Sequence, residues 1–204
     1  MEISRTQKMI LESGKKWFLE KGFKSAPLRS IVSDTGYTLG AFYGYYKTKE
    51  DLFYALTDDT AEEFKTMVNE ISLEMQALPE GKMLYSMMDC YIRKLPELVD
   101  FILLHKDEMT LLLRCSDGTK YEDFFGMFRM RNRKHITEGT RNSEKKVHDL
   151  DSGSMDYLMK GYFDILAGIV MEETERDRMI RMLEDVAMVY KNGILSLMED
   201  NNNA

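Results

Sequence analysis

The residues with the clearest chemical potential lie between positions 36 and 49, where a glycine is followed by a hydroxyl, a short apolar stretch and two lysines. Gly36 permits a tight turn, and Thr38 is placed to cap a helix that runs to about Tyr46. Lys47 and Lys49 follow at once, where their ammonium groups are suited to neutralising phosphates. This pattern predicts contact with a nucleic-acid backbone.

The helices that must position these residues are predicted from apolar spacing and capping signals. Ser4 begins a first helix that Gly22 ends in a left-handed conformation, and a second, short helix covers about 28–35. Thr48 is placed to cap a long fourth helix. The side chains spaced to pack the second helix on the third are Ile31, Val32, Phe42 and Tyr46. This layout is a helix-turn-helix, whose third helix has an exposed face free to enter a major groove.

Residues 9–56 closely resemble the N-terminal domain of TetR-type transcriptional repressors. The matching motif positions are Phe18, Glu20, Lys21, Gly22, Phe23, Arg29, Ile31, Gly36, Thr38, Gly40, Phe42, Tyr43, Tyr45, Lys47, Thr48, Lys49, Glu50 and Leu52. The resemblance covers about a quarter of the chain, and the rest matches only as an all-helical body ending in two long helices. It implies a homodimer on a near-palindromic double-stranded DNA operator, released when a small-molecule effector binds the C-terminal body.

The resemblance also implies which residues meet DNA. Thr38 would cap the recognition helix and touch phosphate, and Gly40 would let the backbone approach. The full set of expected DNA-binding residues is Arg29, Thr38, Leu39, Gly40, Ala41, Tyr43, Tyr45, Lys47 and Lys49. For the tyrosines the alternative is core packing, and for the lysines it is a solvated face.

The sequence departs from the family pattern at Pro27, which replaces a capping hydroxyl before the second helix, and at Leu39, Ala41 and Gly44 in the recognition helix. These residues offer few polar groups to base edges. Because apolar side chains can meet thymine methyl groups, Leu39 and Ala41 are predicted to favour T-containing steps. The same lack of polar side chains is equally consistent with a ligand sensor or interaction module of this fold that has weak or altered DNA binding.

The charge distribution agrees with a DNA-binding front. Residues 1–56 hold nine Lys or Arg against six Asp or Glu, a net +3, whereas residues 57–204 hold 19 against 29, a net −10. No apolar run approaches the 18 residues of a membrane span, and the first ten residues lack a signal core, so we expect a cytoplasmic protein. Cys90 and Cys115 are expected to be buried thiols.

No motif in the sequence predicts catalysis. The chain has no Gly-rich phosphate loop, no nucleophile motif and no ligand spacing for a metal, since its three histidines are scattered. We therefore expect no enzyme activity, no catalytic or metal-binding residues and no cofactor.

The acidic body is rich in methionine, with 15 of the 17 Met residues after position 57. Methionine mostly fills cores, but its flexibility also suits a pocket for varied apolar ligands. The candidate ligand-binding residues are Met87, Tyr91, Phe101, His105, Met109, Phe124, Phe128 and Tyr162. The basic run at 129–134 is either a solvated helix face or a contact for an anionic ligand or an acidic partner surface.

The last two helices each carry an apolar stripe. In the family that the chain resembles, such helices from two subunits pack into a four-helix bundle that forms the dimer interface. The expected interface residues are Leu158, Gly161, Ile165, Val186, Tyr190 and Ile194. The alternative is that both stripes are buried within one subunit. The predicted fold is all-α with about nine helices, arranged as a helix-turn-helix DNA-binding domain at 1–48 and an effector-binding and dimerisation domain at 49–204.

Overall fold

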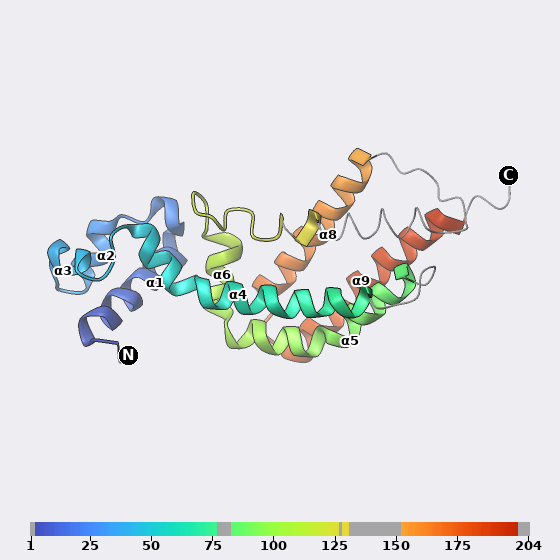
Figure 1. Ribbon diagram of the computed structural model, residues 1–204, viewed down its shortest axis with the longest axis horizontal. Helices are drawn as coiled ribbons and strands as arrows, with labels where there is room; N and C mark the ends of the chain where they lie inside the picture. The colour runs from blue at the N-terminus through green and yellow to red at the C-terminus, as the bar shows by residue number, and fades with distance from the viewer. Residues whose placement is uncertain (1–2, 77–82, 127, 131–151, 200–204) are drawn as a thin grey trace. The chain divides into compact units, whose positions relative to one another are not determined.

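The computed structural model describes residues 3–76, 83–126, 128–130 and 152–199, and over these residues it is helical without strands (Figure 1). The predicted all-α class is confirmed. No described helix is long and apolar enough to cross a membrane. The helices are α1 (Arg5–Ser25), α2 (Leu28–Asp34), α3 (Leu39–Tyr43), α4 (Lys49–Gln76), α5 (Met83–Leu104), α6 (Lys106–Arg114), α8 (Ser152–Glu172) and α9 (Arg176–Glu199).

The helix predicted for about 119–138 falls partly outside the described residues, at 127 and 131–138. Where its start is described, residues 120–125 form turns, so the predicted start at 119 was too early. Helical backbone is present from Gly126, with Met127 outside the described residues.

Local signals fix the starts of the N-terminal helices. The Thr38 hydroxyl accepts a hydrogen bond from the Ala41 N–H at 3.2 Å and so caps α3 as predicted. At the start of α4 the capping is reciprocal: the Asp51 N–H donates to Thr48 at 3.1 Å, and the Thr48 N–H donates to Asp51 at 3.0 Å.

Two glycines with positive φ shape the helix-turn-helix: Gly36 lies in the turn between α2 and α3, and Gly22 lies within α1, which continues to Ser25. Gly36 has φ of 73°, which suits the turn between α2 and α3. Gly22 has φ of 74° but ψ of 159°, so it breaks α1 with a positive φ without adopting the predicted left-handed helical conformation.

The chain forms two compact units. The N-terminal unit comprises Met1–Phe64 and His105–Phe124, and the C-terminal unit comprises Lys65–Leu104 and Phe125–Ala204. The N-terminal unit therefore contains α6 and the first part of α4 in addition to the three helices of the helix-turn-helix. The boundary after residue 48 remains a prediction about function.

Aromatic packing forms the core of the N-terminal unit. The rings of Phe18, Phe23 and Phe53 lie 5.3–5.7 Å apart, which joins α1 to α4. The predicted contact set between α2 and α3 is also buried, since Ile31 and Phe42 are fully enclosed. Burial of this set holds the short α3 helix with its opposite face outward.

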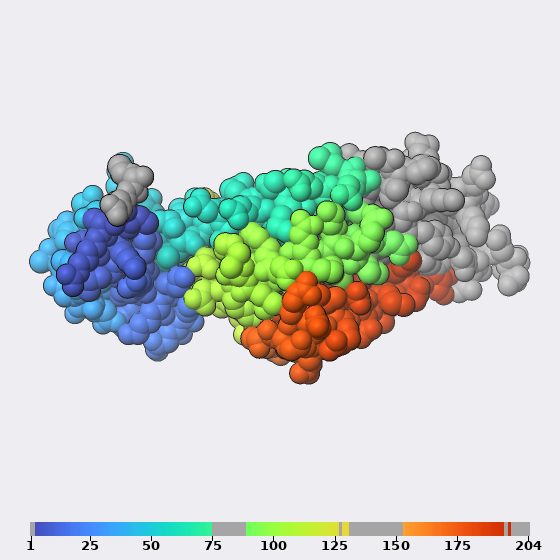
Figure 2. Space-filling model, turned by 90° about the horizontal axis from the view of Figure 1, so that it is seen from below, coloured from blue at the N-terminus to red at the C-terminus, as the bar shows by residue number. Residues whose placement is uncertain are grey.

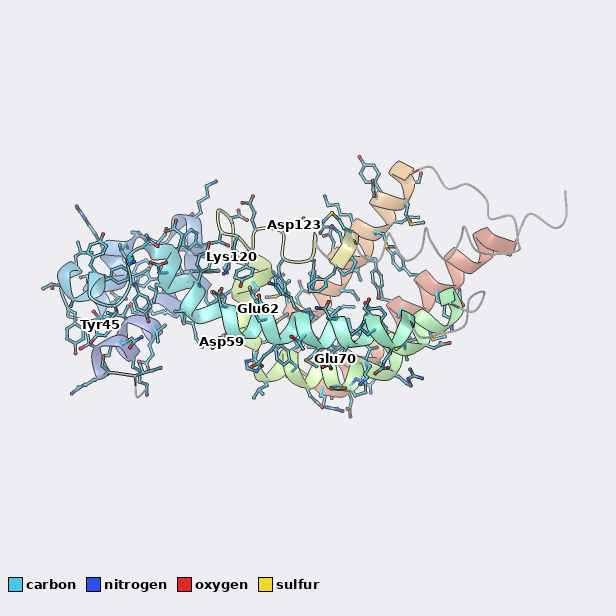
Figure 3. All side chains as sticks on the ribbon, in the orientation of Figure 1. Tyr45, Asp59, Glu62, Glu70, Lys120 and Asp123 are labelled. Atoms are coloured by element: carbon cyan, nitrogen blue, oxygen red, sulfur yellow. The ribbon has the colours of Figure 1, made fainter. Side chains whose placement is uncertain are left out.

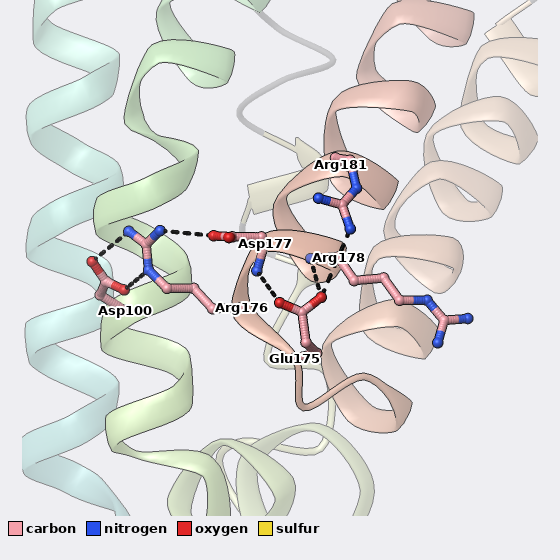
Figure 4. Close-up of polar contacts among 6 residues, drawn as sticks. All are labelled: Asp100, Glu175, Arg176, Asp177, Arg178 and Arg181. Carbon is pink, nitrogen blue, oxygen red and sulfur yellow. Dashed lines mark hydrogen bonds and ion pairs between the residues drawn. The ribbon is translucent and has the colours of Figure 1, made fainter.

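In the C-terminal unit, α9 packs against both α5 and α8, and α5 and α9 lie side by side in both views (Figures 1 and 2). A bidentate ion pair joins them: Arg176 contacts the Asp100 carboxylate at 2.5 and 2.9 Å (Figure 4). A second pair links Lys191 on α9 to Asp89 on α5 at 2.6 Å.

Both cysteines are buried and unbridged, as expected. Burial raises the pKa of the Cys90 thiol and of the Cys115 thiol. Each therefore remains a protonated, unreactive thiol at neutral pH.

Candidate nucleic-acid interface

The outward face of α3 is assembled from a cap, a glycine and an aromatic ring. Thr38 and Gly40 are exposed, and Tyr43 has 55% of its surface exposed although its ring packs edge-on against Phe42, 5.4 Å away. Such a face presents a hydroxyl, an open backbone and a phenol to a partner.

The apolar members of the predicted set are less available. Leu39 and Ala41 are half-buried, so only part of each side chain is presented on α3. Arg29 on α2 and Lys47 after α3 are exposed. The positively charged groups that can meet a phosphate therefore flank α3 rather than lie on it.

Tyr45 is tied to the start of α1. The Ser4 hydroxyl donates to the Tyr45 phenol oxygen at 2.8 Å, and the neighbouring Gln7 amide donates to Tyr46 at 3.4 Å (Figure 3 labels Tyr45). Since 42% of Tyr45 remains exposed, it both anchors α1 and faces solvent. The sequence did not predict that the first turn of α1 and the end of the helix-turn-helix are joined.

The ammonium of Lys49, which the sequence predicts to contact phosphate, lies against the backbone of its own chain. Its ammonium donates to the carbonyls of Phe23 and Ala26 at 2.7 and 3.0 Å and lies 4.4 Å from the centre of the Phe23 ring. Burial lowers the pKa of Lys49. The side chain thus fastens the start of α4 to the corner between α1 and α2, so its role is to position these helices.

Helix α6 is fastened to α1. The ammonium of Lys15 lies 2.6 Å from the Glu108 carboxylate and 3.7 Å from that of Asp107, and the Phe23 N–H donates to the Cys115 carbonyl at 2.8 Å. Burial lowers the pKa of Lys15, but its bonds to the two carboxylates outweigh burial and the net pKa is raised. A displacement of α6 would therefore pull on α1.

A second cluster ties α4 to the segment after α6. Lys120 lies 2.8 Å from the Asp58 carboxylate and over the Tyr54 ring, and the Tyr121 hydroxyl donates to Asp58 at 2.7 Å (Figure 3 labels Lys120). These partners are more than 60 positions apart in the chain, and no sequence signal predicted them.

The candidate ligand residues fall into both units. His105, Met109 and Phe124 belong to the N-terminal unit, where Met109 is fully buried and Phe124 packs on Phe64 and Tyr121. The C-terminal unit holds Tyr91, Phe101, Phe128 and Tyr162, and the side chain of Met87 lies outside the described residues. Within the C-terminal unit, the neighbouring Tyr91 phenol contributes to the raised pKa of Tyr162.

The candidate dimer residues are only partly exposed. Leu158 and Ile165 on α8 are exposed, whereas Gly161, Val186 and Tyr190 are half-buried and the Ile194 side chain lies outside the described residues. Three further apolar side chains are more exposed than the described members of this set, and they are Tyr157, Met188 and Val189.

The fold and this surface define an all-helical helix-turn-helix protein. Comparison with known proteins is consistent with that class: residues 10–56 match the model of the bacterial regulatory proteins of the tetR family. The match covers about a quarter of the chain, including most of α1 together with α2 and α3, and it supports a TetR-type regulator.

Two curated relatives are similar over part of the chain. The HTH-type transcriptional repressor AcnR of Corynebacterium diphtheriae is 32% identical over 84 residues, which are 39% of this chain and 44% of the repressor. The uncharacterized HTH-type transcriptional regulator YuxN of Bacillus subtilis is 27% identical over 108 residues, 53% of this chain and 34% of that protein. The chain thus matches less than half the length of these relatives.

A solved structure extends the similarity of fold to nearly the whole chain. A putative TetR-family transcriptional regulator from Syntrophomonas wolfei aligns with a TM-score of 0.55 at 18% identity. The alignment covers 93% of this chain and 96% of that one. At this identity the likeness concerns the fold alone.

Proposed function

We propose that the protein is a transcriptional repressor that binds a near-palindromic DNA operator as a homodimer. The observation that carries the proposal is the Thr38-capped helix α3, with its buried face fixed by Phe42 and its exposed face carrying Tyr43. A short, rigidly held helix with an open face is the element that helix-turn-helix proteins insert in the major groove. The related AcnR proteins are named as repressors, which supports repression rather than activation of transcription.

We assign phosphate contacts to the polar and positively charged groups that are exposed around α3. Thr38, Tyr43, Tyr45, Arg29 and Lys47 are all exposed, although Thr38 also caps α3 and Tyr45 also accepts a hydrogen bond from Ser4. We place these groups on the DNA backbone, with Leu39, Gly40 and Ala41 against the base edges. Residues 1–48 would then act as the DNA-binding domain.

The remainder, residues 49–204, would hold the effector and the second subunit. A small apolar or amphipathic effector would bind the aromatic interior and bias the protein between two states. The contacts that tie Lys15 to Glu108 and Asp58 to Lys120 support transmission within the N-terminal unit, because both link elements outside the helix-turn-helix to its supporting helices.

The second subunit would cover the exposed apolar side chains of α8 and α9. Ile165 is 44% exposed and Val189 is 70% exposed, and apolar groups on one helix pair suit an isologous four-helix interface. A dimer would also present two copies of α3 to two operator half-sites.

Fluorescence anisotropy with the DNA that flanks the protein's own gene tests this function. We expect binding that is at least about 1,000-fold tighter than to scrambled DNA and that weakens as salt rises, since each neutralised phosphate releases counterions. Equal affinity for both sequences at every salt concentration would refute operator recognition.

A ligand sensor or interaction module with weak DNA binding is the second candidate. It is favoured by the half-burial of Leu39 and Ala41 and by the engagement of Lys49 inside the protein, since each reduces what the surface around α3 offers DNA. The anisotropy measurement separates the two, because only the repressor prefers its own flanking DNA.

A further inference from the structure

Three tyrosines from three helices meet in the C-terminal unit. The rings of Tyr162 on α8 and Tyr190 on α9 have centroids 4.8 Å apart, and the Tyr91 phenol of α5 is close enough to raise the pKa of Tyr162. The Tyr190 hydroxyl lies against α8 at Gly161, where a Cβ atom would come within 3.3 Å of it. Glycine at this position gives the Tyr190 hydroxyl its room beside Tyr162.

The Tyr162 hydroxyl is enclosed and unsatisfied. Tyr162 is only 7% exposed, its ring packs on Phe163 and Tyr190, and its hydroxyl makes no hydrogen bond to any residue that the structure describes. Burying a donor without an acceptor is unfavourable, and most buried hydroxyls in proteins have a partner. The site therefore lacks one hydrogen-bond acceptor.

That acceptor will not come from a second copy of this chain on the exposed face of α8. The exposed residues there, such as Tyr157 and Ile165, flank Tyr162 in the sequence, but Tyr162 itself is already enclosed within its own subunit. The missing acceptor must enter the interior, as a small molecule does.

The residues around Tyr162 determine whether a bound molecule can carry a charge. Tyr162 is 7% exposed, and burying an anion without a partner is strongly unfavourable. Burial and the two neighbouring phenols raise the pKa of Tyr162, and burial together with Asp164 raises the pKa of Tyr190. The phenol therefore stays protonated at neutral pH, and its enclosed position favours an acceptor that carries no charge.

We propose that Tyr162, supported by Tyr91 and Tyr190, is the polar anchor of a binding site for a neutral, mainly apolar molecule that carries a carbonyl or similar acceptor oxygen. The inference rests on the proposed function in that this molecule would be the effector. It narrows the effector from any apolar compound to an uncharged one with an acceptor. The aromatic rings of Tyr190 and Phe163 would flank its apolar part.

Three small probes test the chemistry on the full chain. Acetophenone has an aromatic ring and a ketone, ethylbenzene has a similar shape without the acceptor, and benzoate replaces the ketone by a negative charge. Saturation-transfer NMR gives the dissociation constant of each for the wild-type protein and for Tyr162→Phe. The matched control is Tyr157→Phe, which removes a hydroxyl from an exposed tyrosine on the same helix.

We expect acetophenone to bind the wild-type protein on the order of tenfold tighter than ethylbenzene, since a hydrogen bond to a buried donor contributes about that factor. In Tyr162→Phe the two probes should bind equally, and in Tyr157→Phe the tenfold preference should persist. Benzoate should bind weakest. Equal binding of acetophenone and ethylbenzene to the wild-type protein, tightest binding of benzoate, or no probe binding would overturn the proposal.

The thermal midpoint of the ligand-free protein separates the proposal from a structural role. If the hydroxyl awaits a ligand, Tyr162→Phe unfolds at the same or a higher temperature than the wild type, because it removes an unsatisfied donor. A lower midpoint would mean that an enclosed water or another structural acceptor already satisfies the hydroxyl, which contradicts the proposal.

The outcomes also separate this site from the proposed function. If acetophenone binds through Tyr162 but anisotropy shows no specific DNA binding, the site stands and the repressor function falls. If the operator is bound specifically and ethylbenzene releases it as well as acetophenone does, the repressor function stands and the Tyr162 anchor falls.

Discussion

Lys49 shows how a side chain expected on the surface can become part of the scaffold. Its ammonium is held by two carbonyls at the end of α1 and by the face of Phe23, so it joins three helices at the place where the DNA-reading unit is built. Lys47, two residues earlier, is exposed and has no such partners among the residues that the structure describes. Lys49 is therefore assigned to positioning the helices, and Lys47 is assigned to contacting DNA.

Replacing Lys49 by Met should lower the free energy of unfolding by about 1.5 kcal/mol, near the lower end of the range for charged hydrogen bonds because the side chain is only half-buried. Urea unfolding measures this loss. Lys47→Met should change stability by less than about 0.5 kcal/mol but should reduce the salt dependence of operator binding by about one ion per subunit. The reverse pattern, with Lys47 the stabilising residue, would contradict these assignments.

Gly14 marks a close approach of α1 to α4. A Cβ atom there would lie 2.7 Å from a methyl group of Leu52, which is fully buried and has little room to move. We expect Gly14→Ala to destabilise the protein by about 1–3 kcal/mol in urea unfolding, as overpacked cores do. Gly193→Ala on α9 meets nothing within 4 Å and should be neutral or slightly stabilising. A stable Gly14→Ala protein would show that the two helices can separate without cost.

The sequence predicted those residue-scale features that depend on near neighbours in the chain. The caps by Thr38 and Thr48 and the glycine turns follow from side chains within three positions, and each prediction was confirmed apart from the ψ of Gly22. The bonds of Lys49 and Tyr45 could not be predicted, because their partners lie 23 to 41 positions away and depend on tertiary packing.

At the scale of elements, the pair between Asp100 and Arg176 joins α5 to the start of α9. Its hydrogen bond to Arg176 holds the pKa of Asp100 below its usual 3.8. Because the folded-state pKa is lowered, the pair stabilises the protein fully above pH 3.8, and this stabilisation is lost as the pH falls through the lowered value.

Replacing Asp100 by Asn should therefore lower the thermal midpoint at pH 6, and the difference from the wild type should shrink as the pH falls below 3.8. Thermal unfolding across that range measures it. Asp185→Asn, which removes an exposed α9 carboxylate that has no ion-pair partner among the described residues, is the matched control. If the difference in thermal midpoint between the wild type and Asp100→Asn grew as the pH fell, the predicted direction of the pH dependence would be wrong.

The order and type of helices were largely predictable because apolar periodicity and caps are local. The division of those helices between the two compact units was not predictable from the sequence. Helix α6 belongs to the unit that contains the helix-turn-helix, through Lys15, Glu108 and the bond between Phe23 and Cys115. No periodicity reports such contacts, since they pair residues about 90 positions apart.

At the scale of the whole molecule, the exposed apolar side chains of α8 and α9 predict a dimer. Ile165→Glu should convert a particle of twice the 23.9 kDa chain mass to a monomer in light scattering, because it buries an unpaired charge in the interface. Leu73→Glu, on α4 and 64% exposed, makes the same chemical change outside that surface and should leave the dimer intact. Identical masses for both variants would contradict the proposed interface.

The net charge of −7 was compatible with DNA binding only once its distribution along the chain was considered. The sequence confined the candidate DNA-binding surface to a few residues, because the family pattern is dense there. It could not rank the ligand candidates, since aromatic and methionine side chains have the same pattern in a core and in a pocket. These candidates are distributed over both units of the structure.

The most direct test of the central claim is the operator affinity of Gly40→Asp. Gly40 is exposed in the first turn of α3, and an acidic side chain there favours the helix while placing a negative charge on the surface assigned to DNA. Gly193→Asp changes the net charge equally on α9. By anisotropy we predict about a 100-fold loss of operator affinity for Gly40→Asp, at unchanged thermal midpoint, and less than about a twofold change for Gly193→Asp. A folded Gly40→Asp protein that binds the operator like the wild type would contradict the assignment of α3 as the DNA-reading helix.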